Sequence, residues 1–160
     1  MKHKGFFALL FIAFFGLVPS SSKAQEQDSA FEELDNKNIL IVYLSRTGNT
    51  QEVAEIIYEE VGGEMVELEL ETPYPKDYDE IVVQVDRENE TGYLPPLKTE
   101  IENIQDYDTV FIGFPTWDMQ LPPPMKSFLN KYDLSGKTVI PFNTNGGYGV
   151  GSSFRQVESL

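Results

Sequence analysis

The chain has 160 residues, with 12 Lys and Arg, 26 Asp and Glu, and a formal net charge of −14 at pH 7. A charge this negative disfavours nucleic acid and anionic membrane surfaces as partners, and it favours a partner protein with a basic docking patch. The alternative is that the acidic residues only solvate a small domain. Cysteine is absent and His3 is the only histidine, so disulfide and thiolate chemistry are excluded and the sequence offers no cluster of metal ligands.

Residues 1–24 have the pattern of a secretory signal peptide. A basic start precedes an apolar run that is shorter than the ~20 residues of a membrane span, and small residues lead up to Ala24. We expect cleavage after Ala24 and export to the periplasm; an uncleaved segment that anchors the chain in a membrane is the alternative. Cleavage would remove three of the 12 basic residues and no acid, which changes the net charge from −14 to −17. Residues 25–38 are polar and acidic, which predicts a flexible tether to a domain at 39–160.

Residues 39–44 are six consecutive apolar residues, typical of a strand buried on both faces of a parallel sheet. A polar segment follows at once, and the apolar spacing after it predicts a helix. The N–H groups at the start of such a helix lack partners and, together with the helix dipole, favour an anion. We predict that this loop binds a phosphate through its hydroxyl, amide and backbone donors and its single cation, in Ser45, Arg46, Thr47, Gly48, Asn49 and Thr50.

The composition of this loop narrows the ligand. It lacks the glycine and lysine spacing of nucleoside-triphosphate loops and the three spaced glycines of dinucleotide folds. One terminal phosphate, held mainly by neutral donors, fits the residues better. The alternative is a hydroxyl-rich turn without a ligand, because Asn49 or Thr50 would cap a helix in any case.

Two predicted elements separate this loop from the next buried strand. Residues 64–70 alternate polar and apolar side chains, which predicts a half-exposed edge strand. Residues 78–89 predict a helix with Ile81, Val82 and Val85 facing inward.

A second buried strand is predicted at 109–114, and the loop after it contains the only tryptophan of the chain, Trp117. Pro115 fixes the path of this loop and Thr116 adds a hydroxyl. The indole either caps the core or lies with its flat face against a planar ring. A short helix is expected at 125–130.

Residues 136–142 predict a third buried strand, which leads into a glycine-rich loop and a helix that begins near Ser152. Four glycines within six residues allow the backbone to approach a ligand closely, and Tyr148 stands among them. A flexible linker is the alternative interpretation of the same glycines.

Alternating strands and helices predict right-handed crossovers and a parallel sheet, so the three loops emerge at one edge, where such sheets bind ligands. Residues 45–50 resemble the FMN-phosphate loop of flavodoxins. Five further segments are similar to a bacterial flavodoxin-like family, at residues 74–78, 115–117, 121–124, 132–137 and 144–147. The resemblance implies an α/β fold, with an open, doubly wound parallel sheet of order 2-1-3-4, and FMN as the cofactor.

The resemblance also implies roles for the loops. The first loop would hold the phosphate, and Thr116 and Trp117 would flank the isoalloxazine. The far side of the ring would be lined by the glycine-rich loop, at Asn145, Gly146 and Gly147. Tyr148, in the same loop, is a candidate contact because of its own position and not through the resemblance.

The chain departs from the family pattern at two neighbouring positions. Asp118 stands where a second tryptophan is common, and Met119 stands where glycine is common, which puts a redox-linked flip of that peptide in doubt. Flavodoxins also continue through a fifth strand and a last helix. We expect that this chain is truncated before them, which would leave the strand at 138–142 with an unpaired edge and could weaken FMN binding.

The leading hypothesis is an exported FMN carrier that passes electrons singly or in pairs to a partner protein. No nucleophile or general base stands out in the sequence. The rival hypotheses are an FMN-dependent NAD(P)H or quinone oxidoreductase on the same scaffold, and a truncated domain that no longer holds FMN.

Overall fold

The computed structural model describes residues 38–159, so the predicted signal peptide and the tether up to residue 37 lie outside the described residues. Within 38–159, no helix combines the length and the apolar character that a membrane crossing requires. The elements are β1 (Ile39–Tyr43), α2 (Asn49–Val61), β2 (Glu64–Glu67), α3 (Tyr78–Thr91), the short 3-10 helix η1 (Ile104–Asp106), β3 (Thr109–Pro115), α4 (Pro123–Lys131), β4 (Thr138–Thr144) and α5 (Ser153–Ser159).

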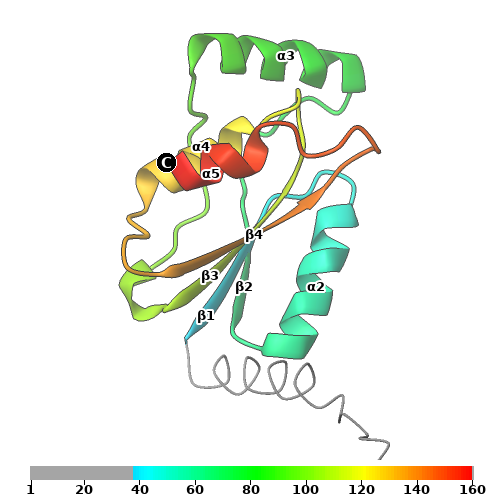
Figure 1. The fold of residues 1–160 in the computed structure, drawn as a ribbon. Coiled ribbons are helices and arrows are strands. Elements are labelled where there is room, and N and C mark those ends of the chain that lie inside the picture. The colour runs from blue at the N-terminus through cyan, green and yellow to red at the C-terminus, as the bar shows by residue number, and fades with distance from the viewer. Residues whose placement is uncertain (1–37, 160) are drawn as a thin grey trace, which may run out of the picture.

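The four strands form one parallel sheet in the order β2-β1-β3-β4, which confirms the predicted fold class and strand order. The order reverses between β1 and β3. Because all strands run in the same direction, the loops that follow β1, β3 and β4 gather at the same edge of the sheet (Figure 1). This is the edge at which open α/β sheets bind ligands.

Helices cover both faces of the sheet, α4 and α5 on one side and α2 on the other (Figure 1). All five residues of β1 are buried. Leu40 and Val42 pack in the cluster that contains Phe128 of α4, whereas Ile41 packs in the cluster that contains Ala54 of α2. Burial on both faces explains why this strand is continuously apolar.

The strand β4 forms as predicted, but it is less buried than the sequence indicated. Six of its seven residues are only half-buried and Thr138 is exposed. The physical reason is its position, because β4 pairs with β3 on one side and with no other strand of the described chain. The ring of Phe142 lies over Gly113 of β3, where a Cβ atom would fall 2.1 Å from the ring.

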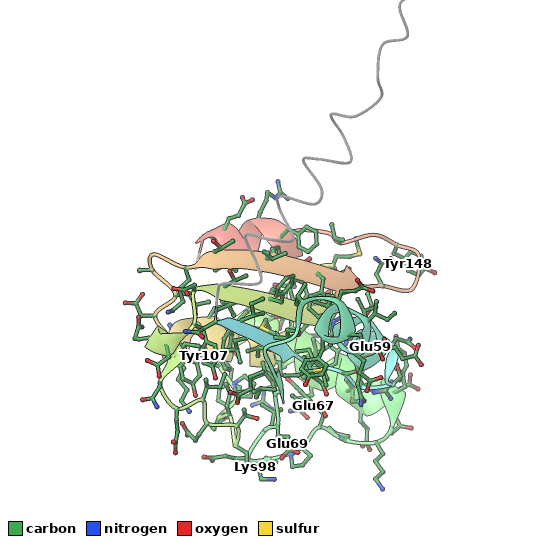
Figure 2. The ribbon with its side chains drawn as sticks, turned by 90° about the horizontal axis from the view of Figure 1, so that it is seen from below. Glu59, Glu67, Glu69, Lys98, Tyr107 and Tyr148 are labelled. Carbon is green, nitrogen blue, oxygen red and sulfur yellow. The ribbon has the colours of Figure 1, made fainter. Side chains whose placement is uncertain are left out.

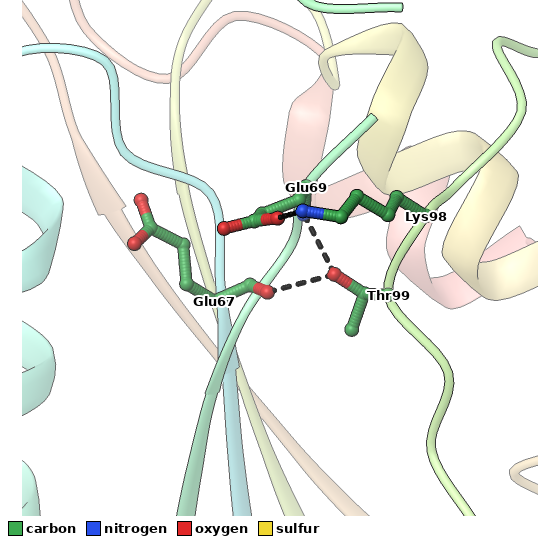
Figure 3. A network of polar contacts seen from close by, with 4 residues as sticks. All are labelled: Glu67, Glu69, Lys98 and Thr99. Atoms are coloured by element: carbon green, nitrogen blue, oxygen red, sulfur yellow. Dashed lines mark hydrogen bonds and ion pairs between the residues drawn. The ribbon is translucent and has the colours of Figure 1, made fainter. Parts of the chain in front are cut away.

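β2 ends at Glu67, before the predicted strand end at Leu70. The chain then pairs with a returning segment. Thr99 donates its hydroxyl to the Glu67 carbonyl at 2.9 Å and accepts the N–H of Glu69 at 2.7 Å. Lys98 forms an ion pair of 2.6 Å with the Glu69 carboxylate (Figure 3). These contacts fix the beginning of the loop that leads to α3.

The helix predicted at 78–89 forms as α3, with Asp77 as its N-cap, but its buried stripe differs from the prediction. Ile81 and Val85 are buried as expected, whereas Val82 is 47% exposed, and Glu88 is buried instead. α3 lies across the carboxyl end of the sheet rather than along one face (Figure 1). It therefore buries only a narrow stripe at i, i+4 and i+7.

Candidate functional site

The loop between β1 and α2 presents a group of backbone donors at the carboxyl edge of the sheet. Gly48 precedes the 13-residue helix α2 with a φ of 88° and has no side chain to cap it, while the Ser45 hydroxyl accepts the N–H of Gln51 in the first turn at 3.3 Å. The N–H groups of residues 46–50 have no hydrogen-bond acceptor among the described residues. A Cβ atom at Gly48 would meet nothing within 4 Å, so the space beside the loop is open. Such a donor set, at the positive end of a helix dipole, fits a phosphate.

The polar side chains of this loop take different positions. Thr47 and Asn49 are exposed and Ser45 is half-buried. The guanidinium of Arg46 lies 5.5 Å from the centre of the Tyr78 ring. Thr50 is buried, and its hydroxyl is hydrogen-bonded at 2.8 Å to the hydroxyl of Thr144 at the end of β4. The side chain of Thr50 thus connects the start of α2 to the end of β4. The N–H group of Thr50 is one of the backbone donors at residues 46–50.

The loop after β3 is tied to the end of β4. The N–H of Thr116 donates to the carbonyl of Thr144 at 2.9 Å, and its hydroxyl donates to Oδ1 of Asn143 at 3.1 Å. Asn143 donates in turn to the carbonyl of Phe114 at 2.9 Å. Pro115, the last residue of β3, pairs with Thr144 in the sheet. The three loops therefore converge on the end of β4, as the sequence predicted.

A tight turn follows at residues 117–120. Trp117 and Gln120 exchange backbone hydrogen bonds of 3.3 and 3.0 Å. Asp118 and Met119 between them have φ values of 49° and 54°, in the left-handed region that favours glycine. This conformation gives a physical reason why glycine is common in the family at the position of Met119.

The carbonyl of Met119 is held by the loop after β4. The N–H of Ser152 donates to it at 2.9 Å. Gly151 packs so closely against it that a Cβ atom at Gly151 would lie 1.9 Å from the Met119 oxygen. The carbonyl oxygen of Met119 therefore already accepts a hydrogen bond from the protein.

The side chain of Asp118 enters a polar network beside α3 and α4. Its Oδ2 accepts hydrogen bonds from the amide groups of Asn89 at 3.1 Å and Gln120 at 2.8 Å. The ammonium of Lys126 donates to the amide oxygens of Asn89 and Gln120 at 2.8 and 2.9 Å. Burial lowers the pKa of Lys126, and the charge of Asp118 opposes this shift. The turn that carries Trp117 is thus held from α3 and α4.

The glycine-rich loop is organised by Asn145. Its Oδ1 accepts the N–H groups of Gly147 at 3.0 Å and Gly149 at 3.2 Å, and its amide donates to Asn143 at 3.2 Å. Gly147 has a φ of 97°. Tyr148 is 86% exposed and lies at the tip of the loop, at the margin of the molecule (Figure 2).

A cavity of about 800 Å³ brings part of the predicted site together. Ser45, Arg46 and Thr47 line it together with Trp117, and the loop after β2 forms the opposite wall. The other ten predicted residues do not line this cavity. Gly48, Asn49 and Thr50 lie at the start of α2, Pro115, Thr116 and Asp118 are neighbours of Trp117 in the chain, and the loop after β4 contains Asn145, Gly146, Gly147 and Tyr148. The cavity is of the size that small-molecule sites have.

Sequence reasoning missed the residues that support Trp117. The Tyr74 ring lies edge-to-face against the indole, with 5.4 Å between centroids, and its hydroxyl donates to Glu88 at 2.5 Å. Burial and this hydrogen bond raise the pKa of Tyr74. Tyr74 belongs to a segment that carries the family resemblance, which was an available signal. No signal identified Glu88 or Lys126, since charged residues on helices are usually solvated.

Comparison with known sequences places residues 38–159 in the flavodoxin family. A flavodoxin of Nostoc sp. is 28% identical over 124 residues, which cover 75% of this chain and 58% of the Nostoc protein. A flavodoxin of Synechocystis sp. is 25% identical over 124 residues, which cover 75% of this chain and 59% of that protein. The chain thus spans less than two thirds of the length of these curated relatives.

Solved structures share the fold. A candidate flavoprotein of Bacteroides eggerthii matches with a TM-score of 0.71 at 35% identity, covering 78% of this chain and 80% of that chain. A flavoprotein of Lactobacillus acidophilus, solved in complex with FMN, matches with a TM-score of 0.70 at 22% identity, covering 77% of this chain and 85% of that chain. At this identity the second likeness shows the fold alone.

Proposed function

The chain belongs to the flavodoxin family, and on this premise we propose that it is an exported FMN-binding protein that transfers electrons to a partner protein. The observation that carries the proposal is the group of unpartnered N–H donors at 46–50, next to the cavity lined by Trp117. FMN, when bound, would supply one- and two-electron redox chemistry, while the protein sets access and potential.

The residues present fit this cofactor. The N–H groups of 46–50 would hold the phosphate, with the hydroxyls of Ser45 and Thr47 beside them. Trp117, with Pro115 and Thr116 before it, would flank the ring system. We further propose that the loop after β4 would contact the far side of the ring, through Asn145, Gly146, Gly147 and Tyr148.

The binding of FMN is tested with the mature chain and a matched ligand pair, FMN and riboflavin, which differ only in the phosphate. Several charge-assisted hydrogen bonds from the first loop should make FMN bind at least ~100-fold more tightly than riboflavin. Quenching of flavin fluorescence measures both dissociation constants. Equal affinities, or no binding of FMN, would reject the assignment of the loop.

The carrier and the oxidoreductase are distinguished by stopped-flow mixing of the FMN-loaded chain with NADPH. Rapid loss of flavin absorbance indicates the enzyme. The absence of direct reduction by NADPH, together with fast reduction by a low-potential protein donor, supports the carrier. The proposal expects the second result.

Export and the docking partner are parts of the same proposal. The N-terminal pattern supports export, and the charge of −14 supports a partner with a basic surface. N-terminal sequencing of the protein recovered from cell fractions should find a periplasmic chain that begins at Gln25. A chain that begins at Met1 in the membrane fraction would instead favour the anchored alternative.

A further inference from the structure

A buried carboxylate lies close to the proposed flavin site without an ion-pair partner. Glu88 on α3 is only 6% exposed, and no salt bridge within residues 38–159 includes it. Its two oxygens accept hydrogen bonds from neutral donors, the Tyr74 hydroxyl at 2.5 Å and the Gln84 amide at 2.8 Å. Burying a carboxylate is unfavourable unless its hydrogen bonds are made, so the contact with Tyr74 constrains both side chains.

This contact reaches Trp117 through the ring of Tyr74. The two rings meet edge-to-face at 5.4 Å, with an interplanar angle of 84°. Edge-to-face packing depends on ring orientation, and the hydrogen bond to Glu88 holds the phenol end of Tyr74. The orientation of the indole is therefore coupled to a carboxylate that does not touch it.

The next residue of α3 holds the same turn at its backbone. Asn89 donates to Asp118, which directly follows Trp117, at 3.1 Å. The last turn of α3 thus supports the ring of Trp117 through Glu88 and Tyr74, and the tight turn below it through Asn89. These contacts connect α3, which lies across the carboxyl end of the sheet, to the turn that carries Trp117 (Figure 1).

We propose that Glu88 and Tyr74 are positioning residues that fix the orientation of the Trp117 indole before any cofactor binds. The significance of this orientation for FMN rests on the proposed function. The positioning itself does not, and it can be measured in the flavin-free protein because Trp117 is the only tryptophan of the chain.

The experiment compares acrylamide quenching of Trp117 fluorescence in flavin-free variants. Tyr74→Phe and Glu88→Ala remove the hydrogen bond, and each should raise the quenching constant about twofold and weaken FMN binding about tenfold, the equivalent of one lost hydrogen bond. Glu88→Gln keeps an acceptor for the Tyr74 hydroxyl and should restore wild-type quenching. The matched controls are Tyr58→Phe on α2 and Glu90→Gln on α3, both exposed side chains that should change neither value.

A purely structural role would lower the free energy of unfolding of Tyr74→Phe and leave quenching in the native state unchanged, and this result would overturn the proposal. Should a single variant fail to fold, Tyr74→Phe with Glu88→Leu removes both polar partners, which is far less costly than removing one. The proposal requires a raised quenching constant in this double variant as well, and a quenching constant equal to that of the wild type would overturn it. If wild-type protein does not bind FMN, the proposed function fails while the fluorescence result still stands.

Discussion

Met119 occupies a backbone conformation that glycine adopts more easily, with a φ of 54° directly after Asp118 at 49°. The left-handed conformation costs a residue with a Cβ atom about 1–2 kcal/mol, and the freedom of glycine in the unfolded chain offsets about 0.4–1 kcal/mol of this. Met119→Gly should therefore raise the free energy of unfolding by about 0.5–1 kcal/mol, measured by urea denaturation. Met119→Ala keeps the Cβ atom and should not be stabilised. A loss of stability in Met119→Gly would mean that the half-exposed methionine side chain contributes more packing than the backbone loses.

Tyr107 links the loop before β3 to the first residue of β2, since its hydroxyl donates to Glu64. This hydrogen bond raises the pKa of Tyr107 from 10.0 to about 12, with smaller contributions from burial and from acidic neighbours. The folded pKa lies above the unfolded one, so the stability from this contact is fully present below pH 10 and is lost as the pH rises through about 12. The difference in unfolding free energy between wild type and Tyr107→Phe should stay constant up to pH 9 and shrink between pH 10 and 12. A difference that is the same at all these pH values would contradict the assignment.

Single residues were also where prediction from the sequence failed. Apolar spacing placed Val82 inside, but the buried stripe of α3 runs through Ile81, Val85 and Glu88. Glu88 can be buried in this stripe because Tyr74, in a loop 14 residues earlier, donates its hydroxyl to the carboxylate. Helical periodicity carries no information about such a contact between separate segments.

At the scale of elements, the strands and their order could be predicted because each buried strand leaves a run of apolar residues and each ends in polar or glycine-rich residues. The degree of burial of β4 could not, since it depends on which strand lies next to it. The convergence of the three loops followed from parallel topology. The hydrogen bonds that connect the loops could not be predicted, because the contact between Thr50 and Thr144 joins residues 94 positions apart.

The contact between the second and third loops can be tested with a matched pair of glycines. Gly149 and Gly151 have φ values of 88° and 57°, but a Cβ atom would meet nothing at Gly149 and would lie 1.9 Å from the Met119 oxygen at Gly151. Gly149→Ala should cost about 1 kcal/mol for its backbone alone. Gly151→Ala should cost about 1–3 kcal/mol more, because the Trp117 turn must move away. Urea denaturation followed by Trp117 fluorescence reports both the stability and the displaced turn. Equal losses in the two variants would show that the close packing of the loops is unimportant.

At the scale of the whole molecule, the composition predicts the acidic net charge, whereas the positions of the acidic residues around the site are known only from the structure. Asp86 and Glu90 are exposed on α3, across the carboxyl end of the sheet where the proposed site lies (Figure 1). Glu59 and Glu60 are exposed near the end of α2, which runs back towards the amino end of the strands. Screening limits steering to about 8–10 Å at physiological ionic strength, so acids near the docking surface should matter most.

Electron transfer from the FMN-loaded chain to a basic acceptor such as cytochrome c should therefore slow by about tenfold or more when ionic strength rises from about 0.02 to about 0.2 M. Asp86→Asn with Glu90→Gln should slow the low-salt reaction more than Glu59→Gln with Glu60→Gln, although both pairs remove two charges. Stopped-flow traces at the two ionic strengths separate the cases, because a steering effect disappears at high salt and a loss of FMN does not. Equal effects of the two pairs would mean that net charge alone attracts the partner, and a rate independent of salt would reject a basic docking patch.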